Sequence, residues 1–443
     1  MKKVHVVGSG LVGSLMAIYL AQKGYSVELY EGRSDMRKAD ISAGRSINLV
    51  ITSRGLWAVR QVGLEEKIMK LTIPMKGRML HDKEGQTTFV PYGQNDDEVI
   101  NSISRGELNN LLMDTVEEYP NVNLHFDKKC EHYDVESGLL TFQDGQKVET
   151  DLVIGADGSF SAVRRSMLDQ VHNFNYNQHF LEHGYKELSI PATPAGDFAM
   201  QREYLHIWPR ENYMLIALPN LDGSFTCTLF YPYEGEQSFA AIQTEADVRE
   251  FFSRDFPDAV PVMPNLVQDY FDNPVGSLVT IRCSPWHADG RMTLMGDASH
   301  AIVPFFGQGM NSGFEDCRVL GELIPPSTEE ADWTNIFGRF QEARLANAEA
   351  IADMALENFV EMRDSTAEPE FQLKKKIGFE LEKRYPEKFI PRYSMVMFHP
   401  DIPYSEARRR SEEQSQLLAK LCAGITSPDQ VDWDQADRLV KSL

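Results

Sequence analysis

The chain opens on a strand–loop–helix–strand unit that restricts its N-terminal region to one kind of fold. Residues 4–7 (Val-His-Val-Val) form a valine-rich run typical of a strand, and residues 8–13 read Gly-Ser-Gly-Leu-Val-Gly. A helical pattern over residues 11–23 and a second strand-like run over residues 27–30 follow. A strand that leads through GxGxxG directly into a helix is typical of the βαβ unit of a Rossmann-like sheet. We therefore expect an α/β domain built on a mostly parallel sheet.

Each glycine of this loop has a separate task in the expected unit. Gly8 makes the turn, Gly10 lets the backbone approach a pyrophosphate, and Gly13 lets the helix and strand pack closely. The start of the helix offers free N–H groups and the positive end of its dipole to phosphates. Glu31 ends the second strand, where a carboxylate can accept hydrogen bonds from ribose hydroxyls. The candidate cofactor contacts in this segment are Gly8, Gly10, Leu11, Val12, Gly13, Glu31 and Arg33.

Two further motifs repeat this strand-to-loop pattern far along the chain. Residues 155–158 read Gly-Ala-Asp-Gly, and residues 296–300 read Gly-Asp-Ala-Ser-His. Alone, each is weak evidence, because an Asp-Gly pair commonly marks an ordinary turn. In this order, the three motifs predict one flavin held at its pyrophosphate, its ribityl chain and its ring edge. The second and third motifs contribute the candidate contacts Asp157, Gly158, Gly296 and Asp297.

The loop after the third motif extends the predicted flavin site. Residues 304–311 read Pro-Phe-Phe-Gly-Gln-Gly-Met-Asn and lead into a helix, whose N-terminus would stabilise an anionic reduced flavin. Phe305 and Phe306 are candidate walls of a dry substrate pocket, and His300 is interpreted as structural. Gly307, Gly309, Met310 and Asn311 are candidate flavin contacts, joined by Arg45 and Arg105, which as single charged residues fit a surface position equally well.

The rest of the chain is divided among three kinds of region. Residues 77–92 form an expected hairpin, residues 176–280 a mostly-β substrate lobe, and residues from about 333 onward a helical region interrupted by prolines. The expected flavin domain has three parts, 1–75, 101–175 and 281–328. The substrate-lobe hairpin is 76–100, the β lobe 176–280, and the C-terminal helical domain 329–443.

Composition excludes several classes of function. A net charge of −22 argues against nucleic acid or an anionic membrane as the main partner. The five cysteines include no CxxC pair, so neither a disulfide framework nor a zinc site is expected, and no other metal cluster is apparent. No run approaches the length of a spanning helix, and the chain begins on a strand rather than a signal peptide. We expect a soluble cytoplasmic monomer or homodimer.

The sequence offers one dinucleotide-binding loop rather than two. No second GxGxxG lies in a βαβ context, since the glycines at 307, 309 and 313 have another spacing and belong to the flavin loop. A nicotinamide reductant must therefore bind transiently between lobes, or the reductant is of another kind.

The motifs in this order resemble the FAD-dependent aromatic hydroxylases of the p-hydroxybenzoate hydroxylase-like class over most of residues 1–325. More specific stretches resemble the kynurenine 3-monooxygenase family. These are residues 44–49 (Gly-Arg-Ser-Ile-Asn-Leu), 76–81 (Lys-Gly-Arg-Met-Leu-His), 304–311, 355–364 (Ala-Leu-Glu-Asn-Phe-Val-Glu-Met-Arg-Asp) and 391–396 (Pro-Arg-Tyr-Ser-Met-Val). The last two are absent from flavin hydroxylases in general.

That resemblance implies a reaction and a substrate site. FAD is reduced by NADPH and reacts with O2 to a C4a-hydroperoxyflavin, which hydroxylates L-kynurenine to 3-hydroxykynurenine in tryptophan catabolism and NAD biosynthesis. The substrate carboxylate is held by residues that fall at Arg78, Tyr92, Asn358 and Tyr393. Because the substrate ring is electron-rich, no dedicated acid or base is expected among the catalytic residues. Membrane-anchored relatives carry an apolar C-terminal segment, which residues 437–443 do not form.

The residues give partial support to these assignments. Arg78, Val90 and Tyr92 share one face of the hairpin if position 80 pairs with position 88, a register that the sequence leaves open. Asn358 interrupts an apolar helical stripe, where an amide needs a partner because leaving it unpaired costs about 1–3 kcal/mol. A core asparagine bonded to backbone fits that position as well, and Tyr393 fits as a core tyrosine.

Three other functions are compatible with the motifs. The first is a flavin hydroxylase acting on another aromatic substrate. The second is a flavin dehydrogenase or reductase that does not use O2 productively. The third is a non-catalytic module that uses the flavin fold to bind a protein. Arg78, Asn358 and Tyr393 favour kynurenine hydroxylation over the first of these.

Overall fold

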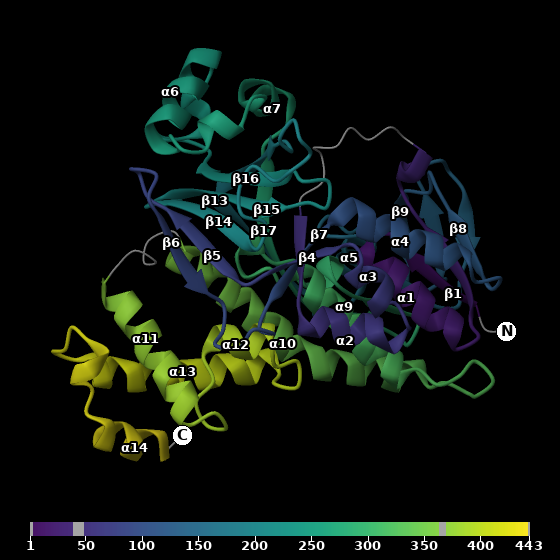
Figure 1. The fold of residues 1–443 in the computed structure, drawn as a ribbon. Helices are drawn as coiled ribbons and strands as arrows, with labels where there is room; N and C mark the ends of the chain where they lie inside the picture. The colour runs from purple at the N-terminus through teal and green to yellow at the C-terminus, as the bar shows by residue number, and fades with distance from the viewer. Residues whose placement is uncertain (1–2, 39–47, 363–368, 442–443) are drawn as a thin grey trace. The chain divides into compact units, whose positions relative to one another are not determined.

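The computed structural model describes residues 3–38, 48–362 and 369–441 (Figure 1). Arg45, one of the candidate flavin contacts, lies outside the described residues. The chain divides into two compact units. The first unit comprises Met1–Ile73, Asn101–Glu182 and Val275–Ala352, and the second comprises Pro74–Ile100, His183–Pro274 and Asp353–Leu443.

The first unit is built on a six-stranded sheet in the order β18-β19-β12-β1-β2-β8. Strands β19, β12, β1, β2 and β8 run parallel, and β18 pairs antiparallel at the edge. In chain order the strands are β1 (Lys3–Val7), β2 (Ser26–Tyr30), β8 (Val122–His125), β12 (Val153–Gly155), β18 (His287–Ala288) and β19 (Met292–Leu294). The expected α/β class and parallel sheet are confirmed.

Helix α1 (Leu11–Gln22) forms the centre of this unit's core. Nine of its residues are buried, and it packs against α4 (Arg105–Glu117) and α9 (Gly309–Leu323). A helix that is apolar on all sides belongs inside a protein rather than at its surface. The remaining helices of the unit are α2 (Ser53–Gln61), α3 (Glu65–Met69), α5 (Ala162–Gln170), α8 (Asp297–His300) and the first part of α10 (Trp333–Val360).

Two further sheets have three strands each. One of them is an antiparallel meander, with Gly145 at φ 84° in the turn between its last two strands. It contains β9 (Cys130–Asp134), β10 (Leu139–Phe142) and β11 (Lys147–Glu149). The other small sheet contains β3 (Asn48–Ile51), β7 (Ile100–Ser104) and β4 (Thr72–Met75).

The second unit contains a large, mainly antiparallel sheet. Its strands follow the order β13-β16-β15-β14-β5-β6, with only β14 and β5 pairing parallel. They are β13 (Asn175–Ile190, in this unit from His183 onward), β16 (Phe225–Pro232), β15 (Tyr213–Pro219), β14 (Tyr204–Arg210), β5 (Gly77–His81) and β6 (Thr87–Pro91), whereas β17 (Gly276–Ser284) belongs to the first unit. Helices α6 (Glu245–Asp255) and α7 (Leu266–Asp272) interrupt the expected β lobe. A capping box at Thr244 and Asp247 begins α6.

The C-terminal region is helical, as the sequence predicts. After α10 come α11 (Pro369–Arg384), α12 (Arg392–Met397), α13 (Tyr404–Cys422) and α14 (Trp433–Lys441). Helices α11, α13 and α14 lie together (Figure 1) and share a small apolar core that includes Ile377, Leu381 and Leu417. Across the described ranges, no helix combines the length and apolar character that crossing a membrane requires.

Candidate cofactor and substrate sites

The three glycine motifs meet because they follow three adjacent parallel strands. Val7 at the end of β1 pairs with Gly155 at the end of β12, and Gly155 pairs with Leu294 at the end of β19. The carboxyl ends of parallel strands lie at one edge of a sheet, where ligands of α/β proteins bind. Segments nearly 300 residues apart in the sequence are thus gathered at one edge of the first unit.

The first motif combines a tightly packed turn with an open space beside one of its glycines. Gly8 has φ 102°, and a Cβ there would lie 2.4 Å from the Ala156 carbonyl oxygen. A Cβ on Gly13 would lie 1.9 Å from the Gly8 carbonyl oxygen. By contrast, apart from Gly10 and its chain neighbours, no heavy atom of the described residues lies within 4 Å of the Cβ position on Gly10. Gly8 and Gly13 therefore permit close protein packing, whereas the space beside Gly10 is available to a ligand.

The third motif lies against the first. Gly296 has φ 58°, and its Cβ position is 3.0 Å from Val12 Cγ2. The Asp297 side chain is accessible to solvent, yet protein surrounds it so closely that burial raises its pKa, while the nearby Arg105 and His300 act to lower it. An accessible carboxylate enclosed in this way lies in a concave part of the surface. Because Arg105, at the start of α4, acts to lower the pKa of Asp297, its guanidinium lies close to that carboxylate.

A buried ionic network holds the third motif in place. The Asp316 carboxylate accepts hydrogen bonds from the Gly296 N–H at 2.9 Å, His300 Nε2 at 2.6 Å and Arg344 Nε at 2.7 Å. Burial acts to raise the pKa of the Asp316 carboxyl, but His300 and Arg344 hold it below its usual value. His300 also stacks on Trp286. These contacts agree with the structural interpretation of His300.

The second motif is bound into the protein more tightly than the sequence suggests. The Asp157 carboxylate accepts from the Ser161 hydroxyl at 2.5 Å and from the Ala162 N–H at 2.7 Å, so it caps α5. Arg164, which resembles a surface charge in the sequence, is buried and donates to the Ala298 and Ser159 carbonyl oxygens. Arg164 therefore ties the second motif to the third.

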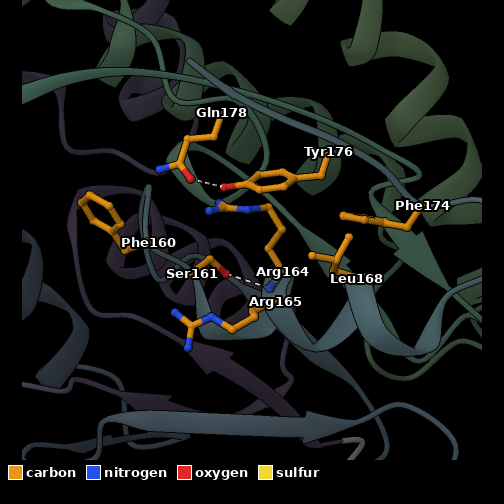
Figure 2. A pocket seen from close by; sticks show the side chains of 8 residues that line it. All are labelled: Phe160, Ser161, Arg164, Arg165, Leu168, Phe174, Tyr176 and Gln178. Carbon is orange, nitrogen blue, oxygen red and sulfur yellow. Dashed lines mark hydrogen bonds between the residues drawn. The ribbon is translucent and has the colours of Figure 1, made fainter. Parts of the chain in front are cut away.

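Arg164 also lines a pocket beside the second motif. Figure 2 shows its guanidinium next to the ring of Tyr176, with 5.1 Å between the Arg164 Cζ and the ring centroid. The Tyr176 hydroxyl donates to Gln178 Oε1 at 2.7 Å. Phe160, Leu168 and further side chains complete the lining. These contacts orient the Arg164 head group while it holds the two motifs together.

Three of the predicted cofactor contacts have protein partners of their own. The Asn311 side chain accepts from the Thr52 N–H and donates to the Val50 and Gly307 carbonyl oxygens, so its amide stabilises the loop. Glu31 accepts from Arg33 Nε at 2.8 Å, and the two form an ion pair. Their roles toward a cofactor stay predictions. The N-terminus of α9, which begins at Gly309, keeps the N–H groups that a helix start leaves unpaired.

Two substrate candidates, Arg78 and Tyr92, come from the hairpin in the second unit, whose register the sequence leaves open. Leu80 pairs with Thr88, which places Arg78 opposite Val90. Tyr92 follows β6, and its N–H donates to the Lys76 carbonyl oxygen at 3.1 Å. The predicted shared face of the hairpin is therefore present.

Arg78, Tyr92 and Tyr393 form one cluster, called here the Arg78 cluster. The Arg78 Cζ lies 5.7 Å from the Tyr92 ring centroid and 5.0 Å from the Tyr393 centroid. The two phenol rings stack with 5.2 Å between centroids and an interplanar angle of 8°. Rings placed over a guanidinium hold it in one orientation through cation–π attraction. Helix α12 thus brings Tyr393 to a hairpin about 300 residues earlier in the chain.

The Arg78 cluster presents polar groups that the protein does not satisfy. Within the described ranges, Arg78 Nε and the Tyr92 hydroxyl are buried without a hydrogen-bond partner. Glu361 is the carboxylate that affects the pKa of Arg78, and it does so through charge alone, without a hydrogen bond. Burial acts to lower the pKa of Arg78, but its neighbours raise it above its usual value, so the group is a cation. Burial raises the pKa of Tyr393 to about 12 and that of Tyr92 further, so both phenols keep their protons. A cation and phenol donors suit a carboxylate.

Asn358 lies at the end of α10 in the same unit. It is buried, and its amide donates to Met362 Sδ at 3.3 Å. Glu361, one turn later, lies close enough to Arg78 to affect its pKa, so this turn of α10 faces the Arg78 cluster. Arg392, next to Tyr393, donates to Glu357 at 2.6 Å and to Glu361 at 2.8 Å. These ion pairs join α12 to α10.

The remaining substrate candidates belong to the first unit. Phe305 and Phe306 are buried in a single 3-10 turn at residues 304–306. Their predicted role as pocket walls stays a prediction. Sequence reasoning missed Glu361 and Lys375, whose electrostatic interactions with Arg78 appear only in the folded chain. The one available signal was the position of Glu361 three residues after Asn358.

Comparisons with known proteins agree with this geometry. The family model described as FAD binding domain matches residues 1–355. A kynurenine 3-monooxygenase of Myxococcus xanthus is 48% identical over 444 residues, covering 99% of this chain and 95% of that protein. One from Dictyostelium discoideum is 42% identical over 453 residues, covering 99% and 98%.

Solved structures support the fold. Tetrameric 2-methyl-3-hydroxypyridine-5-carboxylic acid oxygenase aligns with a TM-score of 0.67 at 18% identity, covering 83% of this chain and 94% of that one. A variant of Klebsiella pneumoniae HpxO complexed with FAD aligns with a TM-score of 0.66 at 17% identity, covering 95% and 98%. The open space beside Gly10, the enclosed Asp297 carboxylate and the α9 N-terminus fit a bound FAD. This chain belongs to the kynurenine 3-monooxygenase family of FAD-dependent monooxygenases.

Proposed function

We propose that this protein hydroxylates L-kynurenine to 3-hydroxykynurenine with NADPH and O2, and that the Arg78 cluster binds the amino-acid carboxylate of the substrate. The observation that carries the site assignment is the buried Arg78 guanidinium without an ion-pair partner in the described part of the chain. Leaving such a charge unpaired costs several kcal/mol, and a substrate carboxylate removes that cost.

Each residue of the cluster has a part in this proposal. Arg78 supplies the charge, Tyr92 and Tyr393 donate hydrogen bonds, and the Asn358 amide supplies a further polar contact. The FAD supplies activation of O2 with electrons from NADPH. The protein orients the substrate ring and excludes water from it, because water diverts the oxidant to hydrogen peroxide. An aniline ring needs no base for this reaction, so no side chain is assigned proton abstraction.

The proposal also covers the oligomeric state of the protein and its location in the cell. A monomer or a homodimer is the proposed assembly. All five cysteines are free and buried. Free thiols are usual in a reducing compartment, which supports the cytoplasm as its location.

Substrate-stimulated NADPH consumption tests the proposed reaction. We expect L-kynurenine to accelerate NADPH oxidation by the FAD-loaded protein and to appear as 3-hydroxykynurenine in the products. The measurement is NADPH absorbance, with separation of the hydroxylated product from hydrogen peroxide. Stimulation that yields only peroxide would mean that kynurenine is an uncoupling effector and that a related aromatic is the substrate. Absence of any stimulation would overturn the assignment.

Replacement of Asp297 tests the proposed cofactor site. Asp297→Ala is expected to weaken FAD binding roughly 10- to 100-fold, since hydrogen bonds to a charged group contribute about 1.5–3 kcal/mol. FAD titration of the apoprotein, followed by flavin fluorescence, measures this. Asp169→Ala removes an exposed carboxylate of the same unit and should bind FAD as the wild type does. Equal affinity of the Asp297 variant and the wild type would contradict the role.

A further inference from the structure

Lys375 places a second basic group beside the Arg78 cluster. It lies on α11, and its Nζ is 3.5 Å from the Pro91 carbonyl oxygen. Pro91 pairs with Gly77 across the hairpin, so the ammonium lies next to the residues that precede Arg78 and Tyr92. The Phe379 ring centroid is 5.7 Å from the same nitrogen. A long contact to one carbonyl oxygen and a position over an aromatic ring leave this half-buried amine weakly solvated.

The charged groups around Lys375 do not balance. Arg78, Lys375 and Arg392 are the cations of this region, and Glu357 and Glu361 are its carboxylates among the described residues. Arg392 already pairs with both carboxylates. Among the charged groups named here, the three cations therefore outnumber the two carboxylates by one.

Lys375 is the group of this region that titrates near neutral pH. Burial and, to a smaller extent, Arg78 lower its pKa to about 7, while Glu361 acts to raise it. Tyr92, which follows β6, and Tyr393, on α12, keep their protons because their pKa values are raised. On α11 itself, Glu370 pairs with Lys374, and Glu382 binds Gln94.

We propose that Lys375 is a second cation of the substrate-carboxylate site, and that it takes up one proton from solvent when the carboxylate binds Arg78. This inference rests on the proposed function. A carboxylate on Arg78 offsets the positive charge that repels a proton from Lys375, and it adds an attractive charge of its own. Protonated Lys375 then contributes to holding the carboxylate.

The sign of the resulting pH dependence follows from linkage. Below about pH 7 Lys375 already carries its proton in the free protein, so substrate affinity is constant there. Above that pH the free protein must gain a proton to bind, so the Kd rises by up to tenfold per pH unit. Proton uptake per bound substrate rises from near zero at about pH 6 toward one at about pH 8.

Calorimetry of L-kynurenine binding to the FAD-loaded protein measures this uptake directly. Titrations in phosphate and in Tris, which have different ionisation enthalpies, give the number of protons exchanged at each pH. Lys375→Met is expected to abolish the uptake and the pH dependence of the Kd. Lys375→Arg keeps a permanent charge, so it should bind tightly without proton uptake even at about pH 8.

Lys376→Met is the matched control, because Lys376 is exposed on the same helix and should behave as the wild type. Wild-type binding without proton uptake, or uptake that persists in Lys375→Met, would overturn the role of Lys375 while kynurenine hydroxylation stands. Failure of the wild type to bind or hydroxylate kynurenine would instead overturn the proposed function, and this inference with it.

Discussion

Arg78→Ala is expected to raise the KM for L-kynurenine at least roughly 30-fold while the protein retains its FAD. Removing one partner of a buried, hydrogen-bonded charge pair costs about 2–5 kcal/mol, and each 1.4 kcal/mol is a factor of ten. The side chain is buried between two tyrosine rings in the second unit, and the glycine motifs belong to the first. Steady-state NADPH oxidation gives the KM, and flavin absorbance gives the FAD content.

A matched arginine distinguishes this effect from a general loss of positive charge. Arg202 is exposed in the same unit, so Arg202→Ala should leave the KM unchanged. Arg78→Lys should fall between the wild type and Arg78→Ala, because lysine keeps the charge but not the forked donors that match a carboxylate. Loss of FAD from Arg78→Ala, or an unchanged KM, would remove Arg78 from the substrate site.

The parts of the fold that the sequence predicts well are those in which local pattern and tertiary structure agree. The opening motif lies between two apolar strands, and β1, α1 and β2 form at the expected positions. The hairpin register was left open, and the structure pairs Leu80 with Thr88. Alternation of buried side chains favours one register of such a hairpin, because a slip of one residue would expose the buried face.

The parts that the sequence cannot predict depend on partners distant in the chain. Asn311 was expected beside the flavin, but its amide is bound by backbone groups that include Val50 and Thr52, some 260 residues earlier. Nothing near Arg164 in the sequence shows its buried acceptor, the Ala298 carbonyl oxygen, which lies 134 residues later. Lys375 lies in a run of three lysines, a pattern typical of a solvated helix face. Only the packing of α11 against the hairpin distinguishes it from its neighbours.

The glycines of the first motif give a paired test of the cofactor site. Gly13→Ala is expected to destabilise the protein itself, because its Cβ would lie 1.9 Å from the Gly8 carbonyl oxygen and the backbone must shift. Gly10→Ala should leave the stability of the apoprotein within about 0.5 kcal/mol, since its Cβ position is open and its φ of −72° suits alanine.

The two variants therefore separate folding from cofactor binding. In Gly10→Ala the added methyl group occupies space through which a pyrophosphate approaches the loop, so FAD affinity should fall at least roughly tenfold and the rise in Tm on adding FAD should shrink. In Gly13→Ala the Tm of the apoprotein should fall before any FAD is added. Thermal melts with and without FAD measure both effects. Wild-type FAD affinity in Gly10→Ala would mean that the pyrophosphate does not lie against this glycine, and the cofactor site would then have to be assigned from the second and third motifs alone.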